Sequence, residues 1–490
     1  MSETRGHPRI LYWLCLTEMW ERFSYYGMRG LLVFYLTQTF LFGDDTAYDI
    51  YGAYTALVYL APLFGGMLAD RVLGNRKAIV IGATLMALGH FAMAFQSLDV
   101  FYGALALLII GNGFFKPNMS TIIGRLYPEG DPRRDAGYTI FYMGVNAGAV
   151  LAGLVPGWVG GKFGWHWGFT LAGIGMVFGL AVFLVTQHKL EGRGDPPDPQ
   201  MLRRRVGPLS VEAWIPVAAA VAVAGVWWLI QYPSLVTGGL KWIFLITVVG
   251  ILLYSFRGLE SVPRHRVWAA LILTVFSVVF WAFFEQAGSS LNLFTGRNVN
   301  TTVMGAQLPA PVMQSINPLF IILLGAPFAW MWSALGRAHR NPTIPAKFAL
   351  GIIQLGLGYA ALYYGAFTSQ ESGIVPLVWL VLGYLLHTTG ELCISPVGLS
   401  MISKLAPAHM TSFMMGTWYL SISTANALAS TIAKLTGVSG EGVPTAELPP
   451  AETVMAYGDL FGQLAIVAGV TGLIVFALSP LIHRATHGVR

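Results

Sequence analysis

The sequence TEMWERFSYYGMR at residues 17–29 lies within an apolar run that covers about residues 10–40. Such a run is long enough to cross a lipid bilayer, yet it carries Glu18, Glu21 and Arg22 near its middle. A charged side chain at the bilayer centre costs roughly 2.5–3.5 kcal/mol. Charges kept at such positions usually lie beside a path for ions or substrates. The segment therefore predicts a membrane protein that moves a solute.

The composition is that of a protein embedded in lipid. Of its 490 residues, 55% are hydrophobic and 11% are charged, and the mean hydropathy is +0.62. Soluble proteins have about 25% charged residues. Because no short apolar leader with a cleavage site is apparent, we expect the first run to be a helix of the mature protein. Runs of about 20 apolar residues predict fourteen spans, near 10–40, 48–70, 77–97, 100–125, 135–160, 166–187, 211–231, 239–257, 267–290, 311–335, 346–368, 374–402, 411–436 and 456–482.

The basic residues that give the net charge of +6 are expected mostly on one side of the membrane. If the N-terminus is cytoplasmic, 22 of the 29 lysines and arginines fall in inner segments. Three more are intramembrane, and the outer segments hold only Lys162, Lys241, Arg297 and Lys434. This asymmetry is a strong positive-inside signal and predicts that both termini are cytoplasmic. The excess charge therefore sets the topology and does not indicate a nucleic-acid partner.

Two polar breaks divide the chain. The stretch 188–208 is rich in proline and charge, and a basic stretch follows at 257–266. Six spans precede this region, six follow it, and the pair between them resembles an inserted hairpin. We therefore expect an all-α membrane protein with a six-helix bundle at 1–187, a cytoplasmic linker and hairpin at 188–266, and a second six-helix bundle at 267–490. Two such halves imply a substrate site between them, near the bilayer midplane.

The loop at residues 66–77 resembles the signature loop of the major facilitator superfamily. Its sequence is GMLADRVLGNRK, in which glycines allow close backbone approach. Asp70 and the basic residues can hold the helix ends together on the inner side. A positively charged inner turn alone would not require the Gly-x-x-x-Asp spacing.

Four polar residues of the first span form one stripe along the helix. Glu18, Arg22, Tyr25 and Arg29 follow the spacing i, i+4, i+7 and i+11. The stripe covers about 16 Å of rise, and Glu21 lies beside it. The alternative is a polar clamp that only holds helices together.

The intramembrane charges as a whole divide unevenly between the two halves. The first half holds two acids and three bases, with Lys116 next to Pro117, whereas the second holds only Glu285 and Glu391. A cavity between the halves would have a cationic wall at Arg29 and Lys116 that faces an anionic wall. The natural guest is a small zwitterion such as a dipeptide, which spans at most roughly 7 Å. Single amino acids are zwitterions as well.

Uncharged residues could line such a cavity for variable side chains. The aromatic candidates offer large apolar faces, and the amide candidates could hold a peptide backbone. Each of them alone is also compatible with ordinary helix packing. They are Tyr25, Tyr26, Tyr59, Trp281, Trp418, Asn146 and Asn317.

Several motifs together resemble the proton-dependent oligopeptide transporter family of the major facilitator superfamily, of the prokaryotic type. The run Glu18-x-x-Glu21-Arg22-Phe23-x-Tyr25-Tyr26-Gly27 resembles the family signature. Residues 141–148, FYMGVNAG, are similar to the motif of the fifth span, with Ala147 where leucine is usual. The segments Phe-Lys-Pro-Asn, Phe-Trp-x-x-x-Glu-Gln and Gly-Glu-Leu-x-x-Ser-Pro also match. The resemblance covers essentially the whole chain.

The resemblance implies symport of di- and tripeptides with protons across a bacterial inner membrane. It assigns the peptide carboxylate to Arg29 and Lys116 and the amine to Glu391. The pocket lining that it implies is Tyr25, Tyr59, Asn146, Trp281, Asn317 and Trp418. The proton-coupling residues that it implies are Glu18, Glu21, Arg22, Lys116 and Glu285.

Proton coupling by histidine is not expected here. Animal members of the family carry a histidine in the second span, where this chain has Gly52. We expect Lys116 and Arg22 to compete for Glu21, and Glu285 to take a proton as its partner changes. His387, one turn before Glu391, could tune that acid or simply be hydrogen-bonded between helices.

Other functions remain open from the residues alone. A related carrier could move an amino acid, nitrate or a drug, although an anion carrier would not need Glu391 opposite Arg29. An enzyme is not expected, because no metal-ligand spacing, nucleophile motif or phosphate loop is present. We expect no cofactor and no metal, with protons as the coupling ion. The sequence leaves the oligomeric state undetermined.

Overall fold

The computed structural model describes residues 6–128, 131, 133–438 and 448–489, and almost all of this chain is helical. Eleven helices of the described residues are long and apolar enough to cross a membrane. Three more long helices, α1, α3 and α16, fall outside that set. The fourteen expected spans are consistent with this fold, and their number stays a prediction. Arg5 and Arg490, expected on the inner side, lie outside the described residues.

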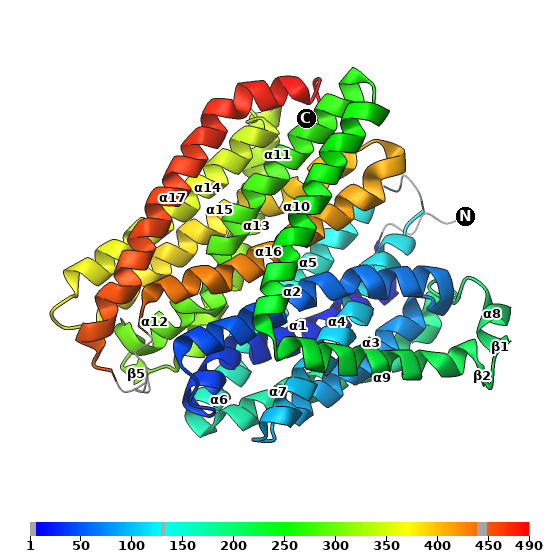
Figure 1. Ribbon diagram of the computed structural model, residues 1–490, viewed down its shortest axis with the longest axis horizontal. Helices are drawn as coiled ribbons and strands as arrows, with labels where there is room; N and C mark the ends of the chain where they lie inside the picture. Colours follow the sequence, from blue (N-terminus) through cyan, green and yellow to red (C-terminus); the bar gives the residue numbers. More distant parts are fainter. Residues whose placement is uncertain (1–5, 129–130, 132, 439–447, 490) are drawn as a thin grey trace. The chain divides into compact units, whose positions relative to one another are not determined.

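Figure 1 shows the elements in chain order, where η marks a short π- or 3₁₀-helical segment. They are α1 (Arg9–Gln38), α2 (Asp44–Leu68), η1 (Ala69–Leu73), α3 (Asn75–Ala92), α4 (Leu98–Arg125), α5 (Arg133–Ala152), η2 (Gly153–Gly157), α6 (Trp158–Phe163), α7 (Trp165–Thr186), η3 (Gln187–Leu190), α8 (Pro199–Arg203), β1 (Arg205–Val206), β2 (Leu209–Ser210), α9 (Val211–Ile230), α10 (Pro233–Gly258), α11 (Ser261–Phe284), η4 (Glu285–Gly288), α12 (Ser290–Asn298), β3 (Val299–Asn300), β4 (Thr302–Val303), β5 (Ala306–Gln307), η5 (Ala310–Ser315), α13 (Ile316–Arg337), α14 (Ile344–Thr368), β6 (Val375–Pro376), α15 (Leu377–Leu405), η6 (Ala408–Met410), α16 (Thr411–Ala433), η7 (Lys434–Thr436) and α17 (Pro450–Ala485). The strands form three two-stranded ladders, β1–β2, β3–β6 and β4–β5.

The chain folds into two compact units. Unit 1 contains Met1–Leu32 and Leu57–Tyr232, and unit 2 contains Val33–Ala56 and Pro233–Arg490. The first helix of the expected hairpin, α9, packs within unit 1, whereas α10 packs within unit 2. The expected division into two six-helix bundles and a hairpin domain stays a prediction.

Small residues bring the helices of unit 1 into close contact. A Cβ atom added at Gly65 of α2 would lie 2.0 Å from the carbonyl oxygen of Gly113 in α4. That carbonyl receives no helical hydrogen bond from Pro117, which has no N–H. Because Lys116 precedes this proline, the close contact fixes the part of α4 that carries a charged candidate residue.

Unit 2 incorporates the ends of α1 and α2 through buried polar contacts. Arg297 of α12 donates hydrogen bonds of 2.5 and 2.9 Å to the two carboxylate oxygens of Asp44, whose side chain is fully buried. Arg297 also contacts the hydroxyl oxygen of Tyr457 at 2.6 Å. A second ion pair joins Lys434 to Asp49 at 2.5 Å. Segment 33–56 is therefore fastened to unit 2 by charge as well as by packing.

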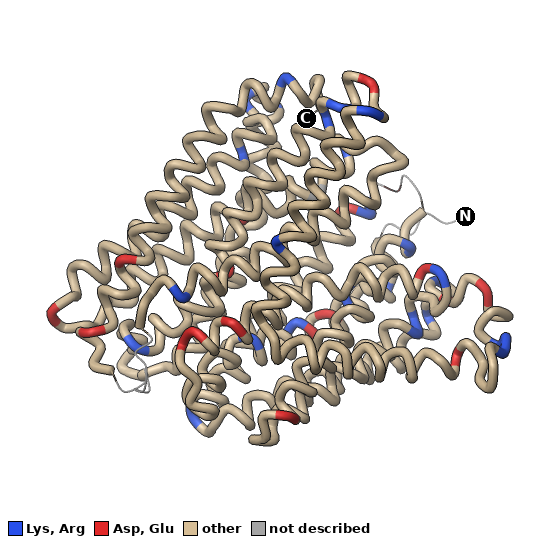
Figure 2. Tube along the Cα trace, viewed as in Figure 1, with Lys and Arg blue, Asp and Glu red and all other residues tan. Residues whose placement is uncertain are grey.

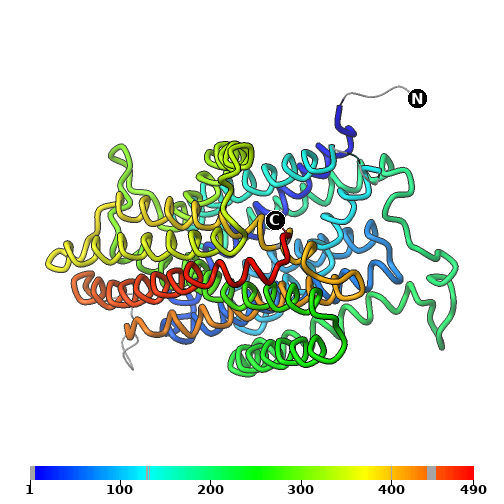
Figure 3. The backbone as a smooth tube through the Cα atoms, turned by 90° about the horizontal axis from the view of Figure 1, so that it is seen from above, coloured from blue at the N-terminus to red at the C-terminus, as the bar shows by residue number. Residues whose placement is uncertain are grey.

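Long antiparallel helices form most of unit 2. Helices α14 and α17 lie side by side in both views (Figures 1 and 3), with α15 against α14. Gly472 of α17 permits this contact, because an added Cβ would lie 2.5 Å from the side chain of Ile353. Buried small residues at such contacts are typical of helices packed in a membrane.

The polar stretch 188–208 is more ordered than a solvated linker. Asp198 caps α8 by accepting hydrogen bonds from the backbone N–H groups of Gln200 and Met201. Arg76 in the first turn of α3 forms a 2.6 Å ion pair with Asp195. Figure 2 shows that many of the charged residues lie near helix ends and in loops.

The expected continuous span at 267–290 is interrupted. Helix α11 ends at Phe284, and Glu285 begins the 3₁₀ segment η4 before α12 starts at Ser290. Gln286 holds this break by donating to the carbonyl oxygens of Ala282 and Ala429. Glu285 therefore sits at a helix end and not in the middle of a regular helix.

Candidate functional site

A buried cluster of three charges lies at the centre of α1. Arg22 donates through Nε to Glu18 Oε1 at 2.9 Å and lies 2.5 Å from Glu21 Oε2. The three side chains are 3%, 5% and 0% exposed. With both carboxylates ionised, the cluster carries one net negative charge. Because a buried net charge is costly, the cluster is suited to take up a proton.

Helix α4 contributes two more polar groups beside this cluster. Asn112 donates to Glu21 Oε1 at 3.5 Å, and Lys116 interacts electrostatically with Glu18 and Glu21. The Lys116 ammonium lies 4.5 Å from the ring centre of Tyr59. Asn112 was missed in the sequence, although it precedes Lys116 by four residues and so lies on the same helix face.

The other candidate residues of unit 1 differ in their contacts and exposure. Tyr25 is buried, and its ring lies 5.4 Å from the guanidinium carbon of Arg22. Arg29, one turn further along α1, is half-buried. Asn146 donates to the carbonyl oxygen of Tyr142 in its own helix at 2.9 Å, so this amide hydrogen bond does not bridge two helices.

Unit 2 presents a carboxylate held by an amide. Asn317 of α13 donates to Glu391 Oε2 at 3.0 Å and to Thr388 Oγ1 at 2.9 Å. Glu391 is half-buried, and no lysine or arginine of the described part of unit 2 forms an ion pair with it. An organic ammonium group could therefore complete its coordination. The spacing of three residues between Thr388 and Glu391 in α15 could have indicated this partner.

The remaining candidates of unit 2 differ in exposure. Glu285 is 3% exposed and interacts electrostatically with Glu391. Trp281, one turn before it, is half-buried. Trp418 is 2% exposed and packs against Gly398, where an added Cβ would lie 2.3 Å from the indole ring. Trp418 therefore packs between α15 and α16, and its expected contact with the substrate stays a prediction.

Gly52 and His387 are the two positions that bear on proton coupling by histidine. A Cβ added at Gly52 would lie 2.3 Å from the Cβ of Ser430, so the backbone leaves no room for the histidine of animal relatives. His387 is buried, and its ring centre lies 4.5 Å from that of Tyr359 on α14. Proton coupling by the carboxylates stays a prediction.

The charged groups thus form two complementary sets. Unit 1 holds Glu18, Glu21, Arg22, Arg29 and Lys116, and unit 2 holds Glu285 and Glu391 with their amide partner. Among the described residues, no three His, Cys, Asp or Glu side chains are grouped so as to hold a metal ion. The carboxylates and bases of each unit can transfer protons and recognise charged organic groups.

Known proteins are similar to this chain over almost its whole length. Residues 76–446 match the POT family. The peptide transporter YePEPT of Yersinia enterocolitica is 36% identical over 98% of this chain and 96% of its own length. The chain belongs to the POT family. The family expected from the motifs of α1, α4 and α15 is therefore confirmed.

Other relatives in this family support the same assignment. A dipeptide and tripeptide permease A of Serratia proteamaculans is 32% identical over 98% of this chain and 92% of its own length. The crystal structure of a mutant peptide transporter POT in complex with alafosfalin superposes with a TM-score of 0.84. The two sequences are 37% identical, and the match covers 99% of this chain and 97% of the transporter chain in that structure. This POT-family chain is a multi-span membrane transporter with the helical fold expected from its sequence.

Proposed function

We propose that this chain imports di- and tripeptides together with protons across the plasma membrane, with both termini in the cytoplasm. The observation that carries the proposal is that unit 1 holds the intramembrane bases, whereas Glu391 of unit 2 forms no ion pair with a lysine or arginine of the described part of that unit. The named relatives, which are peptide transporters and di- and tripeptide permeases, support it. The protein acts by alternating access and carries out no covalent chemistry.

The peptide is held by its two ends. Its carboxylate binds Arg29 and Lys116, because guanidinium and ammonium groups form strong charge-assisted hydrogen bonds with carboxylates. Its ammonium binds Glu391, which Asn317 holds in place. Tyr25, Tyr59, Asn146, Trp281 and Trp418 belong to the surrounding walls. Because the walls contact peptide side chains mainly through apolar faces, varied side chains are tolerated.

Proton coupling follows from the shared use of Lys116. This ammonium group stabilises the ionised forms of Glu18 and Glu21. When the peptide carboxylate binds Lys116, part of that stabilisation is lost, and a proton on Glu21 becomes more favourable. The effect is reciprocal, because a proton that strengthens peptide binding must itself bind more tightly when peptide is present. Glu285 releases or takes a second proton as its partners change during the transport cycle.

The proposal is tested by uptake into proteoliposomes. Labelled dialanine should accumulate against its gradient when the outside is acidic, and excess di- and tripeptides should compete. Free alanine, nitrate and tetraalanine should compete at least tenfold less well. Equal competition by alanine or by nitrate would instead identify an amino-acid or anion carrier. Accumulation that ignores the pH gradient would contradict proton coupling.

A further inference from the structure

Two grooves run along opposite sides of α9 within unit 1, outside the charged site. The first is a cavity of about 610 Å³ between α3, α4 and α9, and its lining includes Leu85, Leu107, Ala220 and Ala224. The second is a cavity of about 450 Å³ between α2, α4 and α9. Many of the α9 residues that line them, including Ala220, Ala222 and Ala224, are exposed. Both grooves are therefore open toward the surrounding lipid.

The first groove opens at one end into a charged mouth. This mouth, a cavity of about 490 Å³, shares Val80, Ile81, Ile215 and Pro216 with the groove, so the two are continuous. It is lined by two bases and two acids, which form the pairs Arg76–Asp195 and Lys77–Glu212. The other end of the groove is lined by Trp227, whose Nε1 donates to the Asp99 carbonyl oxygen.

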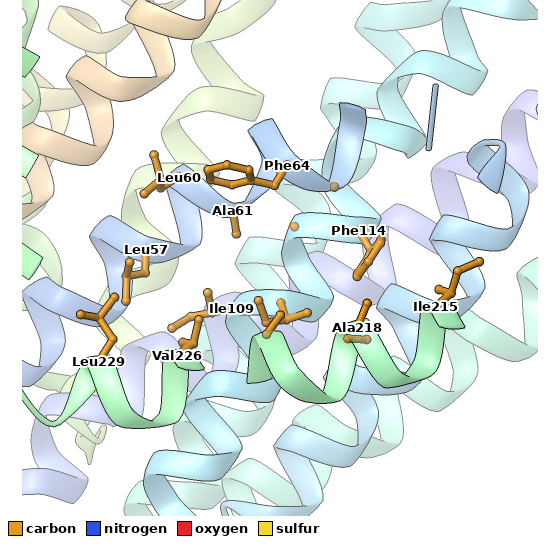
Figure 4. A pocket seen from close by; sticks show the side chains of 15 residues that line it. Leu57, Leu60, Ala61, Phe64, Ile109, Phe114, Ile215, Ala218, Val226 and Leu229 are labelled. Atoms are coloured by element: carbon orange, nitrogen blue, oxygen red, sulfur yellow. The ribbon is translucent and has the colours of Figure 1, made fainter. Parts of the chain in front are cut away.

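The second groove has no such mouth. Figure 4 shows Ala218 and Val226 of α9 facing Ala61 of α2 and Ile109 of α4, and every residue that lines this cavity is apolar. The two grooves therefore differ in one respect that matters for recognition, which is the presence of charge at one end.

The dimensions of the first groove fit one lipid chain. From Ile215 to Trp227, α9 rises about 18 Å. The hydrocarbon core of a bilayer is about 30 Å thick, so each leaflet contributes roughly 15 Å of it. An acyl chain that lies along α9 would therefore fill the groove from the charged mouth to Trp227.

The charges at the mouth select the headgroup. Lys77, Asp195 and Glu212 are 41%, 49% and 52% exposed, and exposed ion pairs contribute little to stability, so a headgroup can exchange into them. The side chain of Arg76 is 25% exposed at the mouth, so its guanidinium can also donate to a phosphate oxygen. The acids can accept hydrogen bonds from a primary ammonium group, which a quaternary ammonium cannot donate.

We propose that the α3/α4/α9 groove and its charged mouth bind one phospholipid with a primary amine, of the phosphatidylethanolamine type. The phosphate contacts Arg76 and Lys77, the ammonium contacts Glu212 and Asp195, and one acyl chain lies against Ala220 and Ala224. The bound lipid fills the space that the small residues of α9 leave beside α3 and α4, and so holds this helix on unit 1.

Neighbouring alanines on α9 provide the test. The purified full chain, delipidated in mild detergent, is titrated with dioleoyl phosphatidylethanolamine, phosphatidylcholine and phosphatidylglycerol, and bound lipid is counted by native mass spectrometry. Ala224→Phe fills the first groove, and Ala222→Phe fills the second groove as the matched control. A double change, Arg76→Gln with Lys77→Gln, removes the bases of the mouth, with Arg205→Gln as its control.

We expect one phosphatidylethanolamine to bind at least tenfold more tightly than the other two lipids. Ala224→Phe and the double change should weaken this binding at least tenfold, and both controls should stay within twofold of the unaltered chain. Dialanine uptake and the unfolding temperature show that each variant is folded. Equal effects of Ala224→Phe and Ala222→Phe, or equal binding of the three lipids, would overturn the proposal. If Ala224→Phe does not fold, Ala220→Phe in the same groove replaces it.

Discussion

Arg22 divides one guanidinium between two carboxylates of its own helix. Because Glu18 and Glu21 compete for a single cation, protonation of either acid leaves the other fully paired. Buried charge of either sign is costly when unpaired. The cluster is therefore neutral with one proton bound and carries one net negative charge without it, and Lys116 biases the choice between these two states.

Glu21→Gln should separate proton coupling from peptide binding. The variant keeps the size of the side chain and the Asn112 contact region but removes the second negative charge, so the cluster becomes neutral without a proton. We expect accumulation driven by a pH gradient to fall to background. Exchange of labelled for unlabelled dialanine at equal pH should stay within about threefold of the unaltered chain. Retained accumulation would remove Glu21 from the coupling scheme.

Asn317→Ala should weaken peptide binding by releasing Glu391. A hydrogen bond to a charged group contributes about 1.5–3 kcal/mol, which corresponds to roughly a 10- to 150-fold change. The KM for dialanine should therefore rise by at least about tenfold, with a smaller change in kcat. Thr388→Val, which removes only the other partner of the same amide, is the control. A larger rise in KM for Thr388→Val than for Asn317→Ala would contradict this role.

Local spacing predicted which residues share a helix face but not the contacts between helices. The i, i+4 relation of Glu18 and Arg22 predicted that they lie on one face, and the structure shows that they form an ion pair. The contacts of Asn317 with Glu391 and of Asn112 with Glu21 join residues far apart in the sequence. Such pairs depend on how helices pack, which no periodicity of a single segment reveals.

Helices in each unit are placed by glycine contacts and by a few buried ion pairs. Gly52 lets α2 approach α16 at Ser430, and Gly65 lets it approach α4 at Gly113. Both contacts depend on the absence of a side chain. A substitution at either position therefore acts on the whole helix and not on one residue alone.

Gly52→His should destabilise the protein and should not create a proton carrier. Its Cβ would lie 2.3 Å from Ser430 Cβ, and overpacking of this kind typically costs 1–3 kcal/mol. We expect a lower unfolding temperature in detergent, partly restored by Ser430→Gly. Gly250→His in α10, where an added Cβ meets nothing within 4 Å, is the control. Unchanged stability of Gly52→His would show that the helices separate more readily than this packing implies.

The ion pair between Asp44 and Arg297 should matter more than any exposed pair. Removal of one partner from a buried pair typically costs 3–5 kcal/mol, because the other charge stays buried. Asp44→Asn should therefore lower the free energy of unfolding by several kcal/mol. Lys77→Gln, in an exposed pair, should cost at most about 1 kcal/mol. Similar losses for both variants, measured by unfolding in detergent, would contradict this difference.

The positions of the helices could be predicted from hydropathy, but their interruptions could not. The run from 267 to 290 is mostly apolar up to Phe284, and the break at η4 depends on hydrogen bonds from Gln286 to the backbone of Ala282 one turn earlier and of the distant Ala429. Likewise, Arg297 was expected in an outer segment, and its side chain is 12% exposed because Asp44 and Tyr457 enclose it. Tertiary partners override local composition in both cases.

Charge is unevenly divided over the whole chain. Unit 1 carries every lysine and arginine expected inside the membrane, and unit 2 carries Glu285 and Glu391. This division could be predicted from sequence, because charges in long apolar runs are few. We call the base-rich set of unit 1 and the acidic set of unit 2 the two poles of the molecule.

The most direct measurement combines variants of both poles with substrates that lack one end. Inhibition constants of dialanine, N-acetyl-dialanine and dialanine amide are compared for the unaltered chain, Glu391→Gln and Arg29→Gln. If Glu391 holds the ammonium, acetylation of that group should raise the inhibition constant at least tenfold for the unaltered chain. In Glu391→Gln the same acetylation should raise the inhibition constant less than about threefold further. The amide should show the same non-additivity with Arg29→Gln. Additive losses in every combination would show that the two poles do not grip the two ends of the peptide.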